Sequence, residues 1–229
     1  MFDAGALLNQ FLGADTSQTI QKGKDYLSNN AGSLAGGAAL GGLGGYMLGS
    51  KKGRKFAKKA ATYGGMALMA GLAYKAYNNY QSQKNSSASS PSPQTEQIAD
   101  ESAFHIENQN GSNSFGAMLI SAMIAAAKAD GKIDGKEHQA IFSRIEEMQL
   151  DNDEKAFLFD QLNRPLDIDS LVSAITSKEQ AVEIYLASLM AIDVDTQAEK
   201  AYLSMLAARL NLEEELVNHI HSTVEQGLD

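Results

Sequence analysis

Two groups of carboxylates occupy matching positions in an internal repeat, and their chemistry is that of hard-cation ligands. The segments EHQAIFSRIEEMQL from Glu137 and EKAYLSMLAARLNL from Glu199 align without gaps. Acidic residues precede each glutamate, in ADGKIDGKE and in AIDVDTQAE. Ca²⁺ and Mg²⁺ prefer clustered carboxylate oxygens. If the repeats pack about a pseudo-two-fold axis, the two turns form a candidate divalent-cation site, made of Asp130, Asp134, Glu137, Asp193, Asp195 and Glu199.

Helix capping is the competing explanation for several of these acids. Asp134 and Thr196 stand three residues before Glu137 and Glu199, which is the spacing of a capping box. Negative charge is also favourable at a helix N-terminus. Capping explains only part of the group, so both interpretations stay open. Capping does not explain Asp130, Asp193 and Asp195.

The other residue types argue against an enzyme. The chain has no cysteine, which excludes disulfides, thiolate metal sites and cysteine nucleophiles. His219 and His221 are two residues apart and would point to different sides of a helix. The sequence contains no phosphate-binding GxxxxGK(S/T) loop, HExxH helix or Ser/His/Asp arrangement. It therefore predicts no catalytic residue and no small-molecule substrate, and a divalent cation is the one cofactor that it suggests.

The carboxylate turns belong to a C-terminal segment, residues 115–229, that has helical periodicity throughout. Helix start signals, each a capping residue three positions before Glu or Gln, occur at Asp134, Asp151, Ser177, Thr196 and Asn211. The segment FGAMLISAMIAAAKA is nearly all apolar and is the expected buried centre. Together with DIDSLVSAI after Pro165, this pattern predicts an all-α bundle of about seven helices without strands.

Residues 31–80 predict a glycine-rich membrane anchor. Residues 31–50 carry no charge, and about 20 such residues cross the hydrocarbon core as a helix. Glycines recur every four residues on one face, which allows close approach of another backbone. These are Gly37, Gly41, Gly45 and Gly49. A second uncharged segment, residues 60–74, extends to Tyr80 if Lys75 reaches the membrane surface, so the anchor has one or two spans.

The basic segment between these two predicts an orientation. KKGRKFAKK, residues 51–59, is rich in Lys and Arg and should stay on the cytoplasmic side of a membrane. If both flanking segments cross, or only the second one, the C-terminal domain lies in the periplasm. A lone crossing by residues 31–50 would leave it in the cytoplasm. Two of the three arrangements therefore favour the periplasm.

Two further segments flank the anchor. Residues 1–30 begin with an amphipathic piece containing Phe2, Leu7 and Leu8, for which a membrane-surface helix and a frayed terminus are both open. Residues 81–114 are rich in Ser, Gln and Asn and contain two of the three prolines, which predicts a disordered tether. The predicted order is thus amphipathic segment, anchor, tether and helical domain.

Charge is distributed unevenly between the two halves. Up to Ser114 there are 10 Lys and Arg against 7 Asp and Glu, whereas from Phe115 onward there are 9 against 21. Nucleic acid needs a basic patch, so the acidic half is a poor candidate for binding it. Cations or a basic partner suit it better.

The paired acidic segments and the order of the other segments resemble those of a known family. ADGKIDGKE and AIDVDTQAE resemble the paired acidic motifs of the TerB-like, tellurite-resistance-type helical domain, although Ile192 stands where the first copy has Asp130. The glycine-rich stretch, KKGRK, the tether, PLDIDSLV and EIYLASLMAIDVD together are similar to the YebE-like inner-membrane proteins, a family of unknown function. The resemblance implies a TerB-like fold at a bacterial inner membrane, a stress-related setting and divalent-cation binding. It implies no enzyme activity.

Two functional hypotheses follow. In the first, the anchor fixes the protein in membrane lipid and the acidic bundle recruits a protein partner or a second copy. In the second, the paired acidic turns bind a divalent cation. An enzyme ranks third, because no catalytic constellation supports it.

Overall fold

The computed structural model describes residues 65–84, 112–129 and 150–228, together with Ala4, Leu7, Leu8, Lys55, Lys59 and Ile145. Within these residues the prediction of an all-α fold without strands is confirmed. The helices with described bounds are α5 (Gly65–Lys84), α6 (Ser112–Ala127), α8 (Asn152–Asn163), α9 (Ile168–Ser173), α10 (Lys178–Ala191), α11 (Gln197–Arg209) and α12 (Glu214–Leu228). Helix α5 therefore runs past the predicted start of the tether, and α6 begins before its predicted end.

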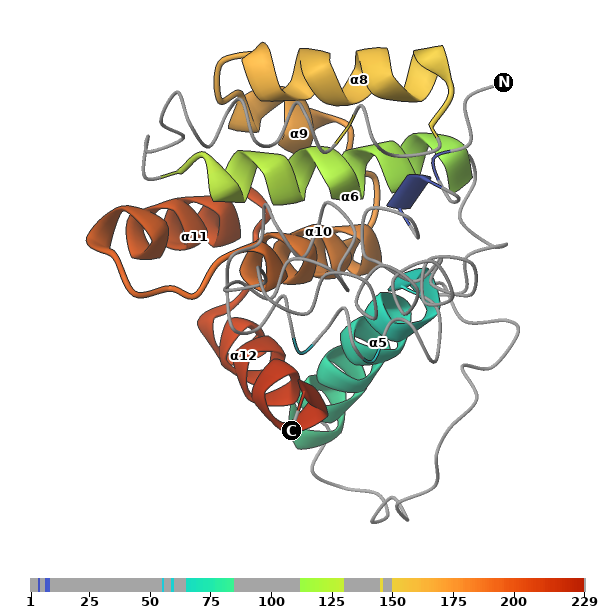
Figure 1. Ribbon diagram of the computed structural model, residues 1–229. Helices are drawn as coiled ribbons and strands as arrows, with labels where there is room; N and C mark the ends of the chain where they lie inside the picture. The colour runs from blue at the N-terminus through green and yellow to red at the C-terminus, as the bar shows by residue number, and fades with distance from the viewer. Residues whose placement is uncertain are drawn as a thin grey trace, which may run out of the picture.

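Helix α10 lies at the centre of the fold, with α5, α6, α11 and α12 around it (Figure 1). Every residue from Ala181 to Ala191 is buried. A helix that is apolar on all sides can be stable in water only if other elements surround it. Helix α6, which was expected at the buried centre, contacts α8, α9, α10 and α11. Much of it is buried, but Met118 and Ser121 are only half-buried.

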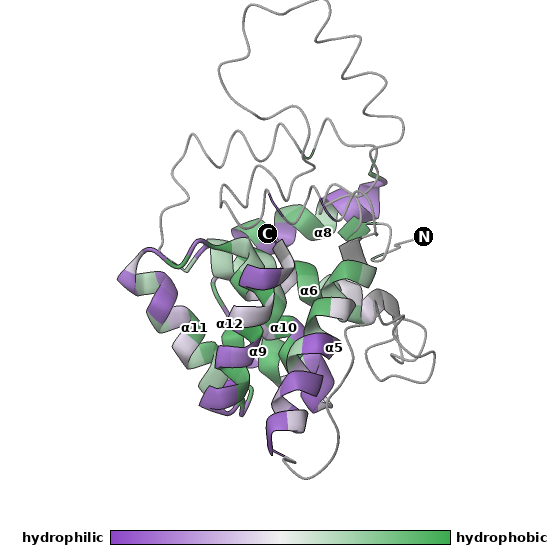
Figure 2. Cartoon of the chain, turned by 90° about the horizontal axis from the view of Figure 1, so that it is seen from below, coloured by the Kyte–Doolittle hydropathy of each residue, from purple (hydrophilic) through white to green (hydrophobic). Residues whose placement is uncertain are grey.

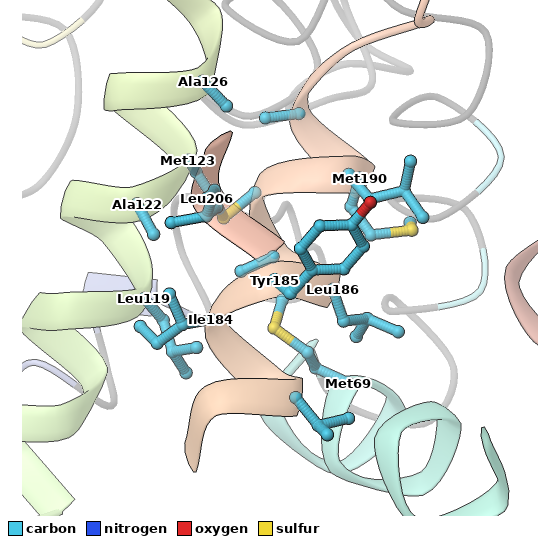
Figure 3. Packing of buried hydrophobic residues seen from close by; sticks show 14 of the residues in the cluster. Met69, Leu119, Ala122, Met123, Ala126, Ile184, Tyr185, Leu186, Met190 and Leu206 are labelled. Carbon is cyan, nitrogen blue, oxygen red and sulfur yellow. The ribbon is translucent and has the colours of Figure 1, made fainter. Parts of the chain in front are cut away.

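The core is built mainly from α6, α10 and α5. In Figure 3, Leu119, Ala122 and Met123 of α6 face α10, and Met69 of α5 lies beside Tyr185 of α10. All five of these side chains are at most 2% exposed. Small residues on α6 allow the two helices to approach closely, while the larger ones fill the space between them.

Three of the predicted helix starts are confirmed by their hydrogen bonds. Asp151 and Thr196 form complete capping boxes with Glu154 and Glu199. The Ser177 hydroxyl accepts a hydrogen bond from the backbone N–H of Gln180. The start signal at Asp134 falls outside the described residues. Local side-chain chemistry therefore sets where these helices begin.

The predicted start at Asn211 was wrong, because this residue ends α11 instead. Asn211 has φ 52°, in the left-handed region that asparagine tolerates better than most residues. Its N–H donates to Ala208 O at 3.2 Å, and the N–H of Leu212 donates to Ala207 O at 3.0 Å. This pair of bonds is the Schellman motif that closes a helix C-terminus. Helix α12 begins three residues later, at Glu214.

Helix α5 covers most of the second predicted anchor segment, and it packs on α12 and α10. One stripe of this helix is buried, formed by Met69, Leu72, Ala73, Ala76 and Tyr80, whereas Lys75 is exposed. None of the helices in the described ranges combines the length and apolarity that a membrane crossing requires. The first segment, residues 31–50, with Gly37, Gly41, Gly45 and Gly49, falls outside the described residues, so its membrane role stays a prediction.

Three described residues near the N-terminus also join the core. Ala4, Leu7 and Leu8 are helical and at most 1% exposed. A Cβ placed on Gly116 of α6 would lie 3.1 Å from Ala4 O, so the chain passes close to α6 at this point. Leu7 and Leu8, for which the sequence left a membrane surface or a frayed terminus open, are covered by protein.

We predict that Met69→Ala lowers the free energy of unfolding by about 2–5 kcal/mol, because it leaves a cavity in a shared core. Lys75→Ala on the exposed side of the same helix should change it by less than about 0.5 kcal/mol. Urea unfolding followed by circular dichroism measures both. Equal effects of the two substitutions would show that α5 does not pack as described.

Candidate functional site

The turn between α10 and α11 holds the described half of the predicted cation site. Asp193, Asp195 and Glu199 lie there, but the Glu199 carboxylate is used by its own turn. Its Oε2 accepts hydrogen bonds from the Thr196 N–H at 2.9 Å, the Thr196 hydroxyl at 2.9 Å and the Asp195 N–H at 3.1 Å. These hydrogen bonds cap helix α11, so capping alone explains why a glutamate stands at position 199.

The other half of that site, Asp130, Asp134 and Glu137, falls outside the described residues, so whether the six carboxylates meet stays untested. Among the residues it does describe, no group of three or more His, Cys, Asp or Glu side chains is arranged to hold a metal ion. The cation site therefore stays a prediction that depends on the first repeat.

The same turn contains a backbone feature that the sequence did not reveal. Val194 has φ 60°, a conformation that is unfavourable for a β-branched residue. Its side chain is partly buried and packs against the core, which offsets part of the cost of this conformation. In the first repeat the equivalent position is Lys132, whose side chain differs in both shape and charge.

A pocket of about 170 Å³ opens between the outer face of α6 and the α8–α9 connection, and we call it the α6–α9 groove. Apolar side chains contribute much of its surface and polar ones stand among them. The described lining residues are Met118, Ser121, Ile124, Ala125, Lys128, Gln161, Arg164, Pro165, Leu166, Asp167, Ser170 and Leu171. Helical spacing along α6 and the break at Pro165 produce the hollow together.

Lys128 forms the polar end of this groove. Its ammonium donates to Leu162 O at 2.9 Å, to Gln161 O at 3.3 Å and to Arg164 O. These carbonyls end α8, where the helix dipole favours a cation. Partial burial lowers the pKa of Lys128, because the charged form is less well solvated there. The lysine thus ties α6 to α8 through carbonyl oxygens.

The opposite wall of the groove is the start of α9. The Asp167 carboxylate caps this helix by accepting from the Ser170 N–H at 3.0 Å, and hydrogen bonds from Ser170 lower the pKa of Asp167. Arg164 pairs with Asp160 at 2.8 Å. Leu166 is 41% exposed beside them, which is unusual for a large apolar residue in this fold. The PLDID segment stands out in the sequence, but no spacing within it points to the groove.

A second polar cluster joins α5 to α10 and α12. Glu213 accepts from Lys84 at 2.6 Å and from Lys178 at 3.1 Å. Lys84 also donates to the Tyr80 hydroxyl at 2.7 Å. Hydrogen bonds from Lys84 and its neighbours lower the pKa of Glu213 to about 2, so this carboxylate stays ionised well below neutral pH. No sequence motif marks this cluster, because its members come from three distant segments.

Comparison with known proteins gives a family but no activity. The family described as "Protein of unknown function (DUF533)" matches residues 33–224. The chain belongs to this family. An "Uncharacterized protein in ampR 5'region" of Yersinia enterocolitica is 29% identical over 108 residues, covering 47% of this chain and 78% of that protein. No solved structure matches.

Membership of the DUF533 family is consistent with the resemblance to the uncharacterised YebE-like proteins. The family match begins within the glycine-rich stretch and extends over both repeats. The match therefore covers most of the glycine-rich stretch as well as the helical body. A TerB-like domain and a membrane location stay predictions for this chain.

We predict that Thr196→Ala lowers the free energy of unfolding by about 0.5–2 kcal/mol through loss of the cap. Asp195→Asn, in the same turn, should stay within about 0.5 kcal/mol because its exposed side chain makes no capping bond. Thermal melting measures both variants. The same melts with added CaCl₂ test the cation hypothesis, because a cation that binds only the folded form raises the melting temperature. A rise that Asp195→Asn abolishes would favour cation binding.

Proposed function

We propose that this DUF533 protein is a membrane-attached interaction module rather than an enzyme. The uncharged residues 31–50 and the basic residues 51–59 support attachment to a bacterial inner membrane. The acidic helical body would then act at the membrane surface, with the periplasmic side favoured by the basic segment. A stress-related role is the setting that the TerB-like resemblance suggests.

The α6–α9 groove is the observation that best supports binding of a protein partner. Its volume of about 170 Å³ suits one large apolar side chain, and Leu166 adds an exposed apolar edge. No histidine or cysteine lines it, so its described chemistry fits recognition better than catalysis. A few apolar contacts in a pocket with a polar rim are typical of an anchor site in an interface.

The charge of the body suggests the chemistry of that partner. Residues 150–228 contain 15 Asp and Glu against 5 Lys and Arg, and only Glu154 and Glu183 of those acids are buried. In Figure 2 hydrophilic residues lie along the outer side of α11 and at one end of α5, with hydrophobic residues where the helices meet. An acidic exterior attracts a basic partner over long range. We therefore propose a basic segment that carries one apolar side chain as the occupant of the groove.

Peptide binding tests this proposal. Short fluorescent peptides with Leu or Phe between lysines should bind the full chain, and the same peptides with glutamate in place of lysine should not. Ala125→Phe fills the groove and should weaken binding by at least about tenfold, the equivalent of 1.4 kcal/mol. Ala208→Phe, on the exposed side of α11, is the matched control. Equal binding by both variants would place the contact elsewhere.

Membrane attachment has a separate test. The full chain, expressed in a bacterium, should sediment with the membrane fraction, and detergent should be needed to release it. Replacing Gly41 and Gly45 with leucine should alter helix packing within the membrane without releasing the protein. Recovery of the unaltered chain in the high-speed supernatant without detergent would refute the anchor.

A further inference from the structure

We propose that the N-terminal residues and the helical body lie on the same side of the membrane, so that residues 31–50 attach to one leaflet and do not cross the bilayer. Described contacts on both sides of the glycine-rich stretch lead to this topology. It rests on the membrane attachment proposed above and specifies how that attachment is made.

The chain before the glycine-rich stretch contacts helix α6. Ala4, Leu7 and Leu8 are helical and at most 1% exposed, and the two leucines belong to the same apolar core as α5, α6 and α10. A Cβ on Gly116 would lie 3.2 Å from Ala4 Cβ. In Figure 1 this short segment, drawn in blue, lies beside α6. Surfaces this close have no room for lipid between them, so these N-terminal residues lie on the side of the body.

The chain after the glycine-rich stretch contacts both ends of helix α12. Lys59 donates to Gly227 O at 2.8 Å, near the end of α12. Lys84, the last residue of α5, pairs with Glu213 just before α12 begins. Between these two lysines, α5 packs on α12 and α10. The chain from Lys59 to Lys84 is therefore held against the body at both ends, and it lies on the same side as the N-terminal residues.

These contacts restrict what residues 31–50 can do in a membrane. After a single crossing, the chain would have to return before Lys59, and the basic residues 51–59 are too few and too polar for a second crossing. Two crossings within residues 31–50 would need about 40 residues. The stretch also has 8 glycines among its 20 residues, so it is only weakly apolar. Such a segment suits the interface of one leaflet, about 5–10 Å deep, where water still reaches the backbone.

The basic residues strengthen attachment to one leaflet. Residues 51–59 include six Lys and Arg, which attract the anionic lipids of the cytoplasmic leaflet. Apolar burial and this attraction add to one another in an interfacial segment. Without a crossing, the body stays on the side of the basic residues, which is the cytoplasmic side. The periplasm was favoured on the assumption that the chain crosses after the basic segment, and the contacts of Lys59 and α5 argue against that crossing.

Disulfide formation tests the N-terminal contact, because the chain has no native cysteine. The full chain with Ala4→Cys and Gly116→Cys is expressed in a bacterium, and its isolated membranes are oxidised and analysed by non-reducing gel electrophoresis. We expect an intramolecular disulfide in most of the membrane-bound chain, since a disulfide cannot form across a bilayer. Ala4→Cys with Met205→Cys, which is exposed on α11, is the matched control and should form severalfold less. Equal yields from the two pairs would overturn the N-terminal contact and the topology with it.

Single cysteines measure the topology without altering the core. Met205→Cys, and separately a cysteine in a tag placed before Met1, are exposed to a membrane-impermeant maleimide in spheroplasts and then after lysis. We expect both to react only after lysis, in protein that sediments with membranes. Reaction of one but not the other in spheroplasts would place them on opposite sides and overturn the proposal, although membrane attachment would stand. Reaction of both in spheroplasts would overturn the cytoplasmic placement. Absence of the chain from the membrane fraction would instead refute attachment itself, and this topology with it.

Discussion

The burial of α10 on every side is the constraint on which the rest of the structure depends. Its segment from Ala181 to Ala191 contains one charged residue, Glu183, and none of it reaches solvent appreciably. Such a helix has no face for water, so each side needs a neighbour. Helices α6, α11 and α12 cover part of it, and α5 covers the remainder. The N-terminal half of the chain is thereby required to complete a core whose centre lies in the C-terminal half.

The polar residues 85–111 separate α5 from α6 in the sequence. They do not separate two cores, because α10 needs both parts of the chain around it. Met69 of α5 and Tyr185 of α10 share one apolar interior (Figure 3). Removal of α5 would expose the α10 surface beneath it, at a cost of about 25 cal/mol for each Å² of apolar area. Residues 85–111 therefore connect two parts of one packed body rather than two bodies.

The helical elements of the C-terminal part could be predicted because their signals are local. Asp151, Ser177 and Thr196 cap the helices that follow them, and each cap depends on residues within one turn. Asn211 was misassigned because asparagine serves both as an N-cap and as a left-handed C-terminal residue. Only the Schellman bonds of the preceding helix distinguish the two roles.

The candidate sites were harder to predict because their residues are brought together by tertiary packing. The α6–α9 groove combines one face of α6 with a connection more than 30 residues later, at Lys128 and Leu162 for example. In the Glu213 cluster, Glu213 binds Lys84, which lies 129 positions earlier. Neither leaves a pattern of spacing in the sequence. The acidic repeat does have a regular spacing in the sequence. In its described half, however, Glu199 caps a helix, and spacing alone cannot distinguish capping from cation binding.

The composition of helix α5 is typical both of a helix packed in a protein core and of a membrane helix. Its buried stripe is made of Met, Leu, Ala and Tyr, with small residues that let another backbone approach closely. A membrane helix needs the same small residues for packing, because close contact replaces the hydrophobic driving force that lipid removes. What separates the two environments is the opposite side of the helix, where Lys75, Asn78 and Asn79 are exposed. In this structure those polar residues lie on the exposed side of α5, while its buried stripe packs against α12 and α10.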